Sequence, residues 1–450
     1  MLNKNNYLWK NPSSSFSQLN MGAKFNKNLL VKIIKSYCKP RRKRYDGHSS
    51  EEFPIVTLFN ALVGNSQRAG TQILNRKLNA LLKNNSQQSM NKGRILPHPS
   101  QMREYARKFS IKETNQTFLN ISKEILPLLL EQKLIPRKLK IAFDFHKELY
   151  YGKKDNPYVI GIKAEKGTKK AFIWHTCGIV LKGRETQIGS ELLKKGVKIG
   201  IFVQKMIEFL ESLGFIVELT AMDKKYYQKW IFKYLDGKNI TYIVPVRESK
   251  KLKGMKEAAL KDPKDRVQTY GMKDDYVKGK GYPRIEFNTA FYGKKNINFG
   301  KLRAQYNNGT RNLKDILADI FVLATNGFIQ SPSVKKKYKF YTTRKEYGGR
   351  WRIEISYREG NPFIMYSTSA DPNVRNFYFI ISLLLYNFWI IANLFVHKTR
   401  YWLVKEPKAY FKEDFKLVLL KAFEYFVNKG PPISKFCRTK ELIGKGCIII

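Results

Sequence analysis

The spacing of hydrophobic and polar positions changes near residue 139 and divides the chain into regions. Before that point apolar residues recur at helical spacing among Lys, Asn and Ser, which predicts a helical N-terminal region over 1–135. A short helix is expected to open at Pro99, and the capping box Ser110 to Glu113 predicts a longer helix. Two helices so close together are typical of helix-turn-helix DNA-binding units, and equally of many helical bundles.

After residue 139 the pattern alternates between strands and helices. The predicted elements are a strand at 139–145, a hairpin at 158–183 turning at 166–168, a helix at 198–213, a strand at 215–223, a helix at 226–235 and a strand at 240–246. This order predicts an α/β fold in which a mixed sheet is flanked by helices. We assign 136–246 to the first part of that core.

The following segment, 247–338, breaks this rhythm with short strands rich in Lys, Gly and Tyr. It is too long for a loop in a compact domain, so we interpret it as a β-rich insertion subdomain. Helical spacing returns in 339–400, the second part of the core, and a basic region follows at 401–450.

One apolar run, Phe377 to Val396, is uncharged and long enough to cross a membrane. It contains polar side chains, among them Asn387 and Asn393, and the chain has no second run of this kind. We therefore expect a buried central helix and no membrane partner.

Composition points to a polyanion as the partner. The chain has 84 Lys and Arg against 36 Asp and Glu, a formal net charge of +48, within a foldable composition that is 43% hydrophobic and 14% aromatic. Such a charge favours nucleic acid, and a ribosomal or chromatin role fits it equally well. Residues Arg41, Arg42 and Arg44 form part of a basic run that could contact phosphates or simply be solvated. The four scattered cysteines argue against a zinc finger or a disulfide framework, and we expect a cytoplasmic, nucleoid-associated protein.

Three acids are candidates for chemistry. Asp144 and Asp223 lie at the C-terminal ends of predicted strands, where a rigid sheet edge can present them to a crevice, although a single Asp there is commonly a cap or turn residue. Tyr347, Arg350 and Glu354 share one helical face with position 361, or they belong to an exposed, salt-bridged surface helix. Together the carboxylates would offer hard oxygen ligands suited to Mg²⁺, and two such ions about 4 Å apart can catalyse phosphodiester chemistry.

These residues carry a family resemblance. Tyr347, Arg350 and Glu354 match the first three positions of a Y-x2-R-x3-E-x6-K signature, and the chain resembles, over roughly 141–393, a DDE transposase of a prokaryotic insertion sequence. The resemblance implies an RNase H-like core interrupted by a β-rich insertion. It also implies Asp144, Asp223 and Glu354 as the catalytic, metal-binding triad for two Mg²⁺ ions, replaceable by Mn²⁺, with Tyr347 and Arg350 holding the DNA.

The chain departs from that pattern at two places. The signature Lys is Asn361, inside a Gly-Asn-Pro sequence that ends the helix, and the Arg-Gly-Phe that often follows the second acid is Lys224-Lys225-Tyr226. We retain Asn361 and Lys224 as candidate DNA contacts. Further candidates on the predicted hairpin, each of which could instead be merely solvated, are Lys163, Lys169 and Lys170. His146, two residues after Asp144, could lie near the metals or serve packing.

The resemblance implies an enzyme that binds the terminal inverted repeats of its element, cleaves by two-metal hydrolysis and joins the 3′-hydroxyl ends to target DNA, working as a homodimer. Two alternatives remain open at this stage. An RNase H-fold nuclease would use the same acids on DNA without regard to repeats, and a domesticated, non-catalytic DNA-binding protein would bind without cutting.

Overall fold

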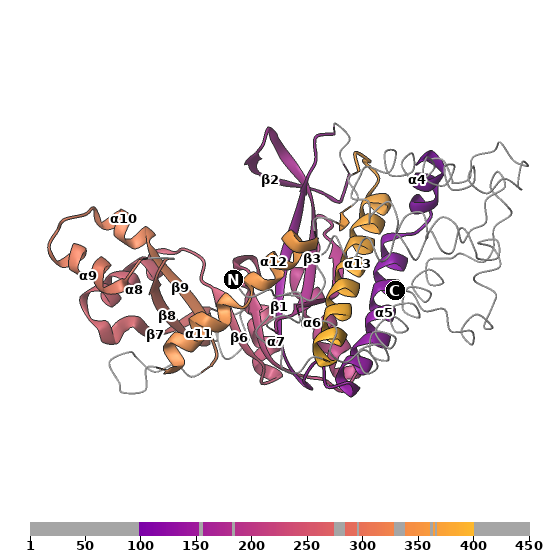
Figure 1. Cartoon of the computed structure of the whole chain (residues 1–450). Helices are drawn as coiled ribbons and strands as arrows, with labels where there is room; N and C mark the ends of the chain where they lie inside the picture. Colours follow the sequence, from indigo (N-terminus) through magenta and orange to yellow (C-terminus); the bar gives the residue numbers. More distant parts are fainter. Residues whose placement is uncertain are drawn as a thin grey trace, which may run out of the picture.

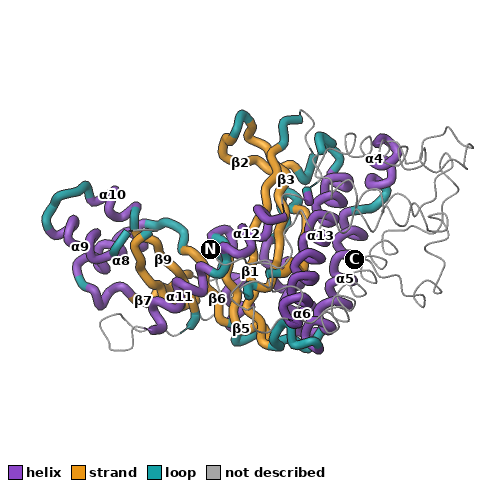
Figure 2. Tube along the Cα trace, in the orientation of Figure 1, coloured by secondary structure: helices purple, strands orange, loops and turns teal. Residues whose placement is uncertain are grey.

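A computed structural model describes residues 99–152, 156–181, 185–273, 284–294, 297–327, 338–360, 363–364 and 367–399. Within these residues nine strands form one mixed sheet in the order β2-β3-β1-β5-β6-β9-β8-β7, with β4 pairing β3 beside this path (Figures 1 and 2). The predicted α/β class with a mixed sheet and flanking helices is confirmed, whereas an RNase H-like family is not established by the sheet alone.

The strands are β1 (Lys138–Leu149), β2 (Val159–Glu165), β3 (Thr168–Ile179), β4 (Thr186–Leu192), β5 (Ile216–Met222), β6 (Thr241–Pro245), β7 (Val267–Lys273), β8 (Arg284–Gly293) and β9 (Ile320–Thr325). The α-helices are α4 (Pro99–Arg107), α5 (Ile111–Glu131), α6 (Ile199–Ser212), α7 (Lys229–Gly237), α8 (Lys250–Lys261), α9 (Phe299–Asn307), α10 (Leu313–Ala318), α11 (Tyr338–Gly348), α12 (Trp351–Gly360) and α13 (Pro372–Thr399). Two short 3₁₀ turns, η2 (Lys224–Tyr226) and η3 (Pro263–Arg266), complete the described elements.

The predicted hairpin is present as β2 and β3, and its turn has the geometry that the sequence indicated. Lys166 and Gly167 have φ values of 45° and 84°, which is the pair of positive φ angles that a type I′ turn requires. The strand β4, which pairs antiparallel with β3, was missed by the sequence pattern because its residues are nearly all buried and do not alternate.

The central strand β1 runs further than its hydrophobic pattern predicted. It pairs parallel with β5 only as far as Phe143 opposite Met222, but it pairs antiparallel with β3 on to Leu149 opposite Ala171. We predicted that Asp144 ends this strand, and that prediction is wrong. The strand continues because β3 forms hydrogen bonds with its backbone beyond Asp144. Asp144 does mark the end of the β1 and β5 pairing, and Asp223 follows β5 directly.

The two faces of the sheet are covered by different helices. Successive side chains of a strand point to opposite faces, so Ala142 and Asp144 share one face and Phe143 lies on the other. Ala142 packs in one cluster with Tyr347 and Ile353, from α11 and α12, whereas the Phe143 ring lies 6.1 Å from the Phe202 ring of α6. Asp144 consequently faces the segment that carries Arg350 and Glu354.

The segment expected to be a β-rich insertion is mixed α/β and extends the core sheet. Strand β9 pairs antiparallel with both β6 and β8, which joins the segment to the core, and α8, α9 and α10 pack together beside it. Figure 1 shows these helices far from α13 within the described part of the chain. The helix α8 was missed because Lys dominates its sequence. Its Lys256 is nevertheless 3% exposed, since the ammonium is bound by Glu248 Oε1 at 2.9 Å and the Leu317 carbonyl at 3.1 Å.

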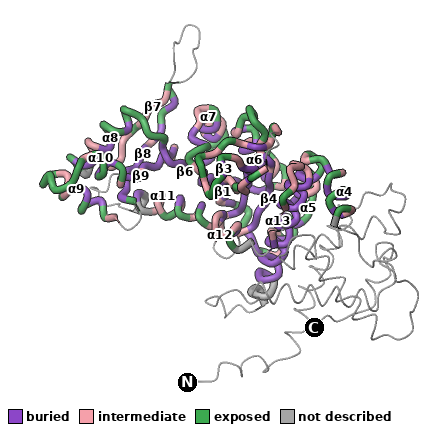
Figure 3. Tube along the Cα trace, turned by 90° about the horizontal axis from the view of Figure 1, so that it is seen from above, coloured by how far each residue is buried: buried purple, intermediate pink, exposed green. Residues whose placement is uncertain are grey.

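The apolar run forms α13, and the prediction of a buried central helix is confirmed. The helix is long and apolar enough to span a membrane, but every residue from Val374 to Leu394 is buried inside the protein, and Figure 3 shows this part of α13 as buried. Its polar side chains have partners: Asn376 accepts from Trp174 Nε1 at 3.1 Å, and Asn387 bonds the backbone of Gln187. These hydrogen bonds remove the cost of burying amides in an apolar helix.

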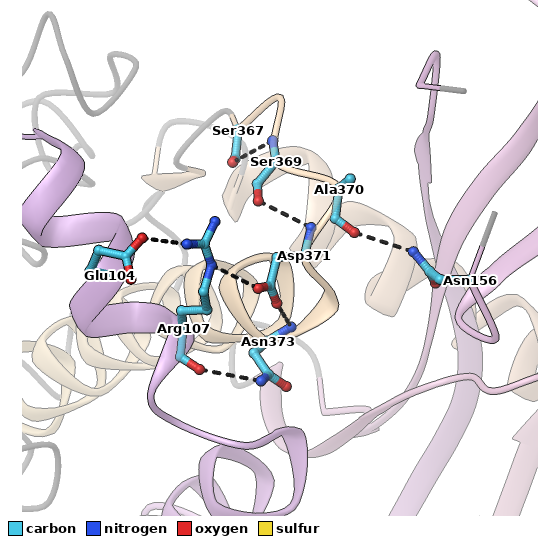
Figure 4. Close-up of polar contacts among 8 residues, drawn as sticks. All are labelled: Glu104, Arg107, Asn156, Ser367, Ser369, Ala370, Asp371 and Asn373. Atoms are coloured by element: carbon cyan, nitrogen blue, oxygen red, sulfur yellow. Dashed lines mark hydrogen bonds and ion pairs between the residues drawn. The ribbon is translucent and has the colours of Figure 1, made fainter. Parts of the chain in front are cut away.

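The helices α4 and α5 are present, with both bonds of the predicted Ser110 and Glu113 capping box. They belong to the packing of the core, because α5 lies against β4 and both helices contact α13. Figure 4 shows the junction. Arg107 Nε donates to Asp371 Oδ2 at 2.9 Å, and Asn373 Nδ2 donates to the Arg107 carbonyl at 3.3 Å. The N-terminus of α13 is thereby held to α4.

Candidate active site

Asp144 is the most buried of the three candidate acids, with 6% of its surface exposed. Its backbone is fixed from both neighbouring elements: the carbonyl accepts hydrogen bonds from Thr176 Oγ1 at 3.4 Å and from Tyr226 Oη at 3.5 Å. Thr176 is also its direct partner across the β1 and β3 ladder. A carboxylate held in this way on a central strand has a fixed direction, as a ligand or catalytic group requires.

Arg350 joins two of the acids. Its Nη1 donates to Asp144 Oδ1 at 3.0 Å, its Nη2 pairs with Glu354 Oε1 at 2.7 Å, and its Nε donates to the Tyr347 hydroxyl at 3.2 Å. Arg350 is 7% exposed. We call this arrangement of Arg350, Asp144 and Glu354 the Arg350 bridge. The alternative of an exposed surface helix is wrong for Arg350, since its guanidinium lies in the interior.

The helical face predicted for these residues is not one continuous helix. The first helix, α11, ends at Gly348, and α12 begins at Trp351, so Arg350 lies in the break between them. Two consecutive glycines, Gly348 and Gly349, explain the break, because glycine in a helix interior is destabilising and kinks occur at such residues. The side chains of Tyr347, Arg350 and Glu354 converge nonetheless.

The position of Glu354 is fixed by the next turn of α12. The Tyr357 hydroxyl forms a hydrogen bond with Thr176 Oγ1, and Ser356 Oγ accepts from Gln187 Nε2 at 2.6 Å. Since Thr176 is opposite Asp144 on the sheet, Tyr357 sets the helix that carries Glu354 in register with Asp144. Sequence reasoning missed Tyr357, although its place three residues after Glu354 on a helix was a usable signal.

Asp223 is the third acid near this point. It precedes the short turn η2, and its carboxylate makes no capping bond there. The charges of Asp223 and of Glu354 both act to raise the pKa of Asp144, which reflects their proximity. The structure thus brings the three predicted acids to one region of the sheet, with Asp223 arriving from the strand beside Asp144.

Burial has the largest effect on the pKa of Asp144. Desolvation raises its pKa from 3.8 to about 7, although the Arg350 guanidinium opposes the rise. Burial likewise raises the pKa of Tyr347 to about 12, against the opposing effect of Arg350. For Arg350 itself burial acts to lower the pKa, but the neighbouring Tyr347, Asp144 and Glu354 outweigh it and the pKa is raised.

The raised pKa of Asp144 predicts a specific pH dependence of stability. Because the folded protein holds this proton more tightly than the unfolded chain, the contribution of Asp144 to stability is largest below pH 4 and is lost as pH rises toward 7, by about 1.4 kcal/mol for each step of one in pH. We expect Asp144→Asn to gain stability relative to wild type across that interval. Urea unfolding of both proteins at a series of pH values measures this, and a difference that does not change with pH would contradict the assignment.

The three carboxylates have the right chemistry to bind a hard divalent cation. Carboxylate oxygens from Asp144, Asp223 and Glu354 are the ligands that Mg²⁺ and Mn²⁺ take in proteins. In geometry, Asp144 and Glu354 each give one oxygen to Arg350, and within the described residues no three His, Cys, Asp or Glu side chains are grouped closely enough to hold an ion. A metal would therefore need the carboxylates to part at least partly from the guanidinium.

Of the basic candidates, Lys224 lies beside the acids because it directly follows Asp223 in the chain. Its side chain is exposed. Its neighbour Lys225 is also exposed, with its ammonium 4.5 Å from the centre of the Phe145 ring. Lys170 lies six residues before Thr176 on β3, about 20 Å along the strand from the acids. The hairpin lysines Lys163, Lys169 and Lys170 are therefore not part of the acid cluster. Four candidates lie outside the described residues: Asn361, Arg41, Arg42 and Arg44.

His146 serves packing in this structure. Its ring stacks on Phe379 with centroids 4.8 Å apart and meets the Tyr357 ring edge at 4.9 Å, and burial lowers its pKa. The predicted DNA contacts of Tyr347 and Arg350 stay predictions, and both side chains are buried here.

Comparison with known proteins leaves the family open. No protein-family model matches the chain, and no curated protein matches it in sequence. Among solved structures the chain is similar to one described as a cryo-EM structure of a piggyBac transposase synaptic complex with hairpin DNA, with 12% sequence identity and a TM-score of 0.48, over 94% of this chain and 84% of that chain. At that identity and TM-score the similarity does not establish a shared fold.

Proposed function

We propose that this protein is a DNA transposase that recognises the terminal inverted repeats of its own element, cleaves phosphodiester bonds at the ends and joins the 3′-hydroxyls to target DNA. The observation that supports the proposal is that Asp144 and Glu354 share one guanidinium, with Asp223 near enough to influence the pKa of Asp144, in a chain with a net charge of +48. A cluster of acids is electrostatically costly, and in a strongly basic chain it is suited to metal-dependent chemistry on a polyanion.

In this proposal the three acids are the ligands of a divalent metal pair. When bound, the ions would activate the attacking oxygen and stabilise the leaving oxygen of the phosphodiester. The chain's own residues fix the acids: Thr176 and Tyr226 hold the backbone of Asp144, and Tyr357 holds the helix of Glu354. Lys224 and Lys225, exposed next to Asp223, would contact the phosphates that flank the cleaved bond.

The lysines beside the acids predict a measurable salt effect. Each phosphate contact contributes about 0.9 to the slope of log affinity against log salt concentration, so Lys224→Ala with Lys225→Ala should reduce that slope by about 1.8. Fluorescence anisotropy of a labelled duplex at several salt concentrations provides the slope. The matched control replaces Lys301 and Lys314, exposed lysines of α9 and α10, and should leave the slope unchanged. Equal slopes in wild type and in the Lys224 and Lys225 variant would remove these residues from the DNA surface.

The experiment that tests the function uses the DNA that borders the gene. Labelled duplexes carrying these sequences, and scrambled versions of them, are incubated with the protein in Mg²⁺, Mn²⁺ or EDTA. Metal-dependent cleavage at the repeat boundary, absent from scrambled DNA, supports the transposase. Equal cleavage of both duplexes would favour a nuclease, and binding without cleavage in either metal would favour a non-catalytic DNA-binding protein.

A further inference from the structure

The Arg350 bridge occupies the place where a metal ion would be needed. One guanidinium contacts both Asp144 and Glu354, at 3.0 Å and 2.7 Å, through two different nitrogens. A third nitrogen, Nε, is bound by the Tyr347 hydroxyl, which fixes the plane of the group. A planar fork of donors between two carboxylates is a strong and directional arrangement; Arg350 and Asp144 are buried, and the Glu354 side chain is 37% exposed.

This bridge and a metal ion compete for the same acids. Each carboxylate gives one of its two oxygens to Arg350, and the guanidinium charge repels any second cation brought between them. When both acids are ionised they carry two negative charges, and the Arg350 guanidinium reduces the net charge of the group to one. The affinity of the DNA-free protein for a divalent ion should therefore be weakened by its own arginine.

Arg350 is also suited to another anion. A guanidinium binds phosphate with the same paired geometry as it binds carboxylate. The residue lies in the break between α11 and α12, where its N–H donates to the Tyr347 carbonyl at 2.9 Å and its carbonyl accepts from the Ile353 N–H at 2.9 Å, so its backbone is held while its side chain reaches the acids. A phosphate arriving at the acids can thus take over donors that now contact Asp144 and Glu354.

We propose that Arg350 keeps the metal site closed in the DNA-free protein, and that a DNA phosphate opens it by drawing the guanidinium away from at least one acid. This inference rests on the proposed function and adds a regulation to it. Metal and DNA would then bind cooperatively, and by linkage each would raise the affinity of the other by the same factor. The protein would be a poor metalloenzyme until its substrate is in place.

The test is the affinity for Mn²⁺, measured from free Mn²⁺ by electron paramagnetic resonance with full-length protein, with and without a duplex. Wild type should bind Mn²⁺ weakly alone and about tenfold more tightly or better with DNA. Arg350→Gln, which removes the charge, should bind about tenfold more tightly than wild type without DNA, and DNA should add little. Arg350→Lys should be intermediate, because a point charge cannot bridge both acids in the same way.

Arg352→Gln is the matched control. Arg352 is on the same helix and pairs with Glu185 at 3.7 Å, outside the acid cluster, so this variant should behave as wild type. If Arg350→Gln does not fold, as judged by circular dichroism, the wild-type comparison with and without DNA still decides the proposal. If neither DNA nor the loss of Arg350 changes the affinity for Mn²⁺, the proposal of a closed site is wrong and the proposed function still stands. No Mn²⁺ binding by wild type even with DNA overturns the proposed function as well.

Discussion

Glu354→Gln is expected to reduce metal-dependent DNA cleavage by about three orders of magnitude, equivalent to about 4 kcal/mol of transition-state stabilisation. The substitution keeps the size of the side chain but removes one anionic oxygen ligand, so a metal ion would be held with the wrong charge and number of donors. DNA binding should be retained, because the substitution removes a negative charge from a surface that attracts phosphate. Rates of strand cleavage on a labelled duplex, together with the affinity for the same duplex, measure both effects.

The matched control for this variant is Glu346→Gln. Glu346 is on α11, close in sequence to the candidate site, and its carboxylate pairs with Lys140 at 2.5 Å instead of joining the acid cluster. Cleavage by this variant should remain within a few-fold of wild type. Full cleavage activity in Glu354→Gln would remove Glu354 from the active site, and equal losses in both variants would indicate a general effect on folding.

Asn387→Leu is expected to lower the free energy of unfolding by about 3 kcal/mol. Its side chain satisfies two backbone groups of β4: Oδ1 accepts from the Gln187 N–H at 2.9 Å, and Nδ2 donates to the Gln187 carbonyl at 2.7 Å. Leucine fills a similar volume but leaves both groups without these partners, and each unsatisfied buried group costs about 1–3 kcal/mol. Urea denaturation followed by circular dichroism gives the change in midpoint.

Ser382→Ala serves as the control on the same helix. The Ser382 hydroxyl is buried and donates only to the Phe379 carbonyl one turn earlier, at 2.6 Å, so its loss affects no other element. We expect a change of less than about 1 kcal/mol. If Asn387→Leu is as stable as wild type, the hydrogen bonds of Asn387 to Gln187 do not stabilise the packing of α13 on β4.

The fold was predictable from sequence where local patterns and tertiary structure agree. The hairpin turn at Lys166 and Gly167, the capping box at Ser110 and the buried helix α13 each follow from a few neighbouring residues. The pattern failed where distant pairing decided the structure. The extension of β1 beyond Asp144 depends on β3, and the joining of β9 to β6 depends on a segment more than 70 residues away.

The candidate site was predictable in its residues and not in its contacts. Spacing placed Tyr347, Arg350 and Glu354 together, and they do converge, but through a helix break at two glycines. Sequence could not show that Arg350 turns inward to Asp144, because that contact joins positions 206 residues apart. Nor could it show the burial that raises the pKa of Asp144 to about 7.

The most direct test of the site is to locate the metal on the protein itself. Fe²⁺ is placed in the site of the DNA-bound protein in exchange for Mg²⁺, and ascorbate with peroxide then generates hydroxyl radicals that cut the nearby backbone. We expect cuts, identified by mass spectrometry and suppressed by excess Mg²⁺, near Asp144, Asp223 and Glu354 together. Cuts near none of these three acids, or cuts that excess Mg²⁺ does not suppress, would contradict a metal site built from these carboxylates.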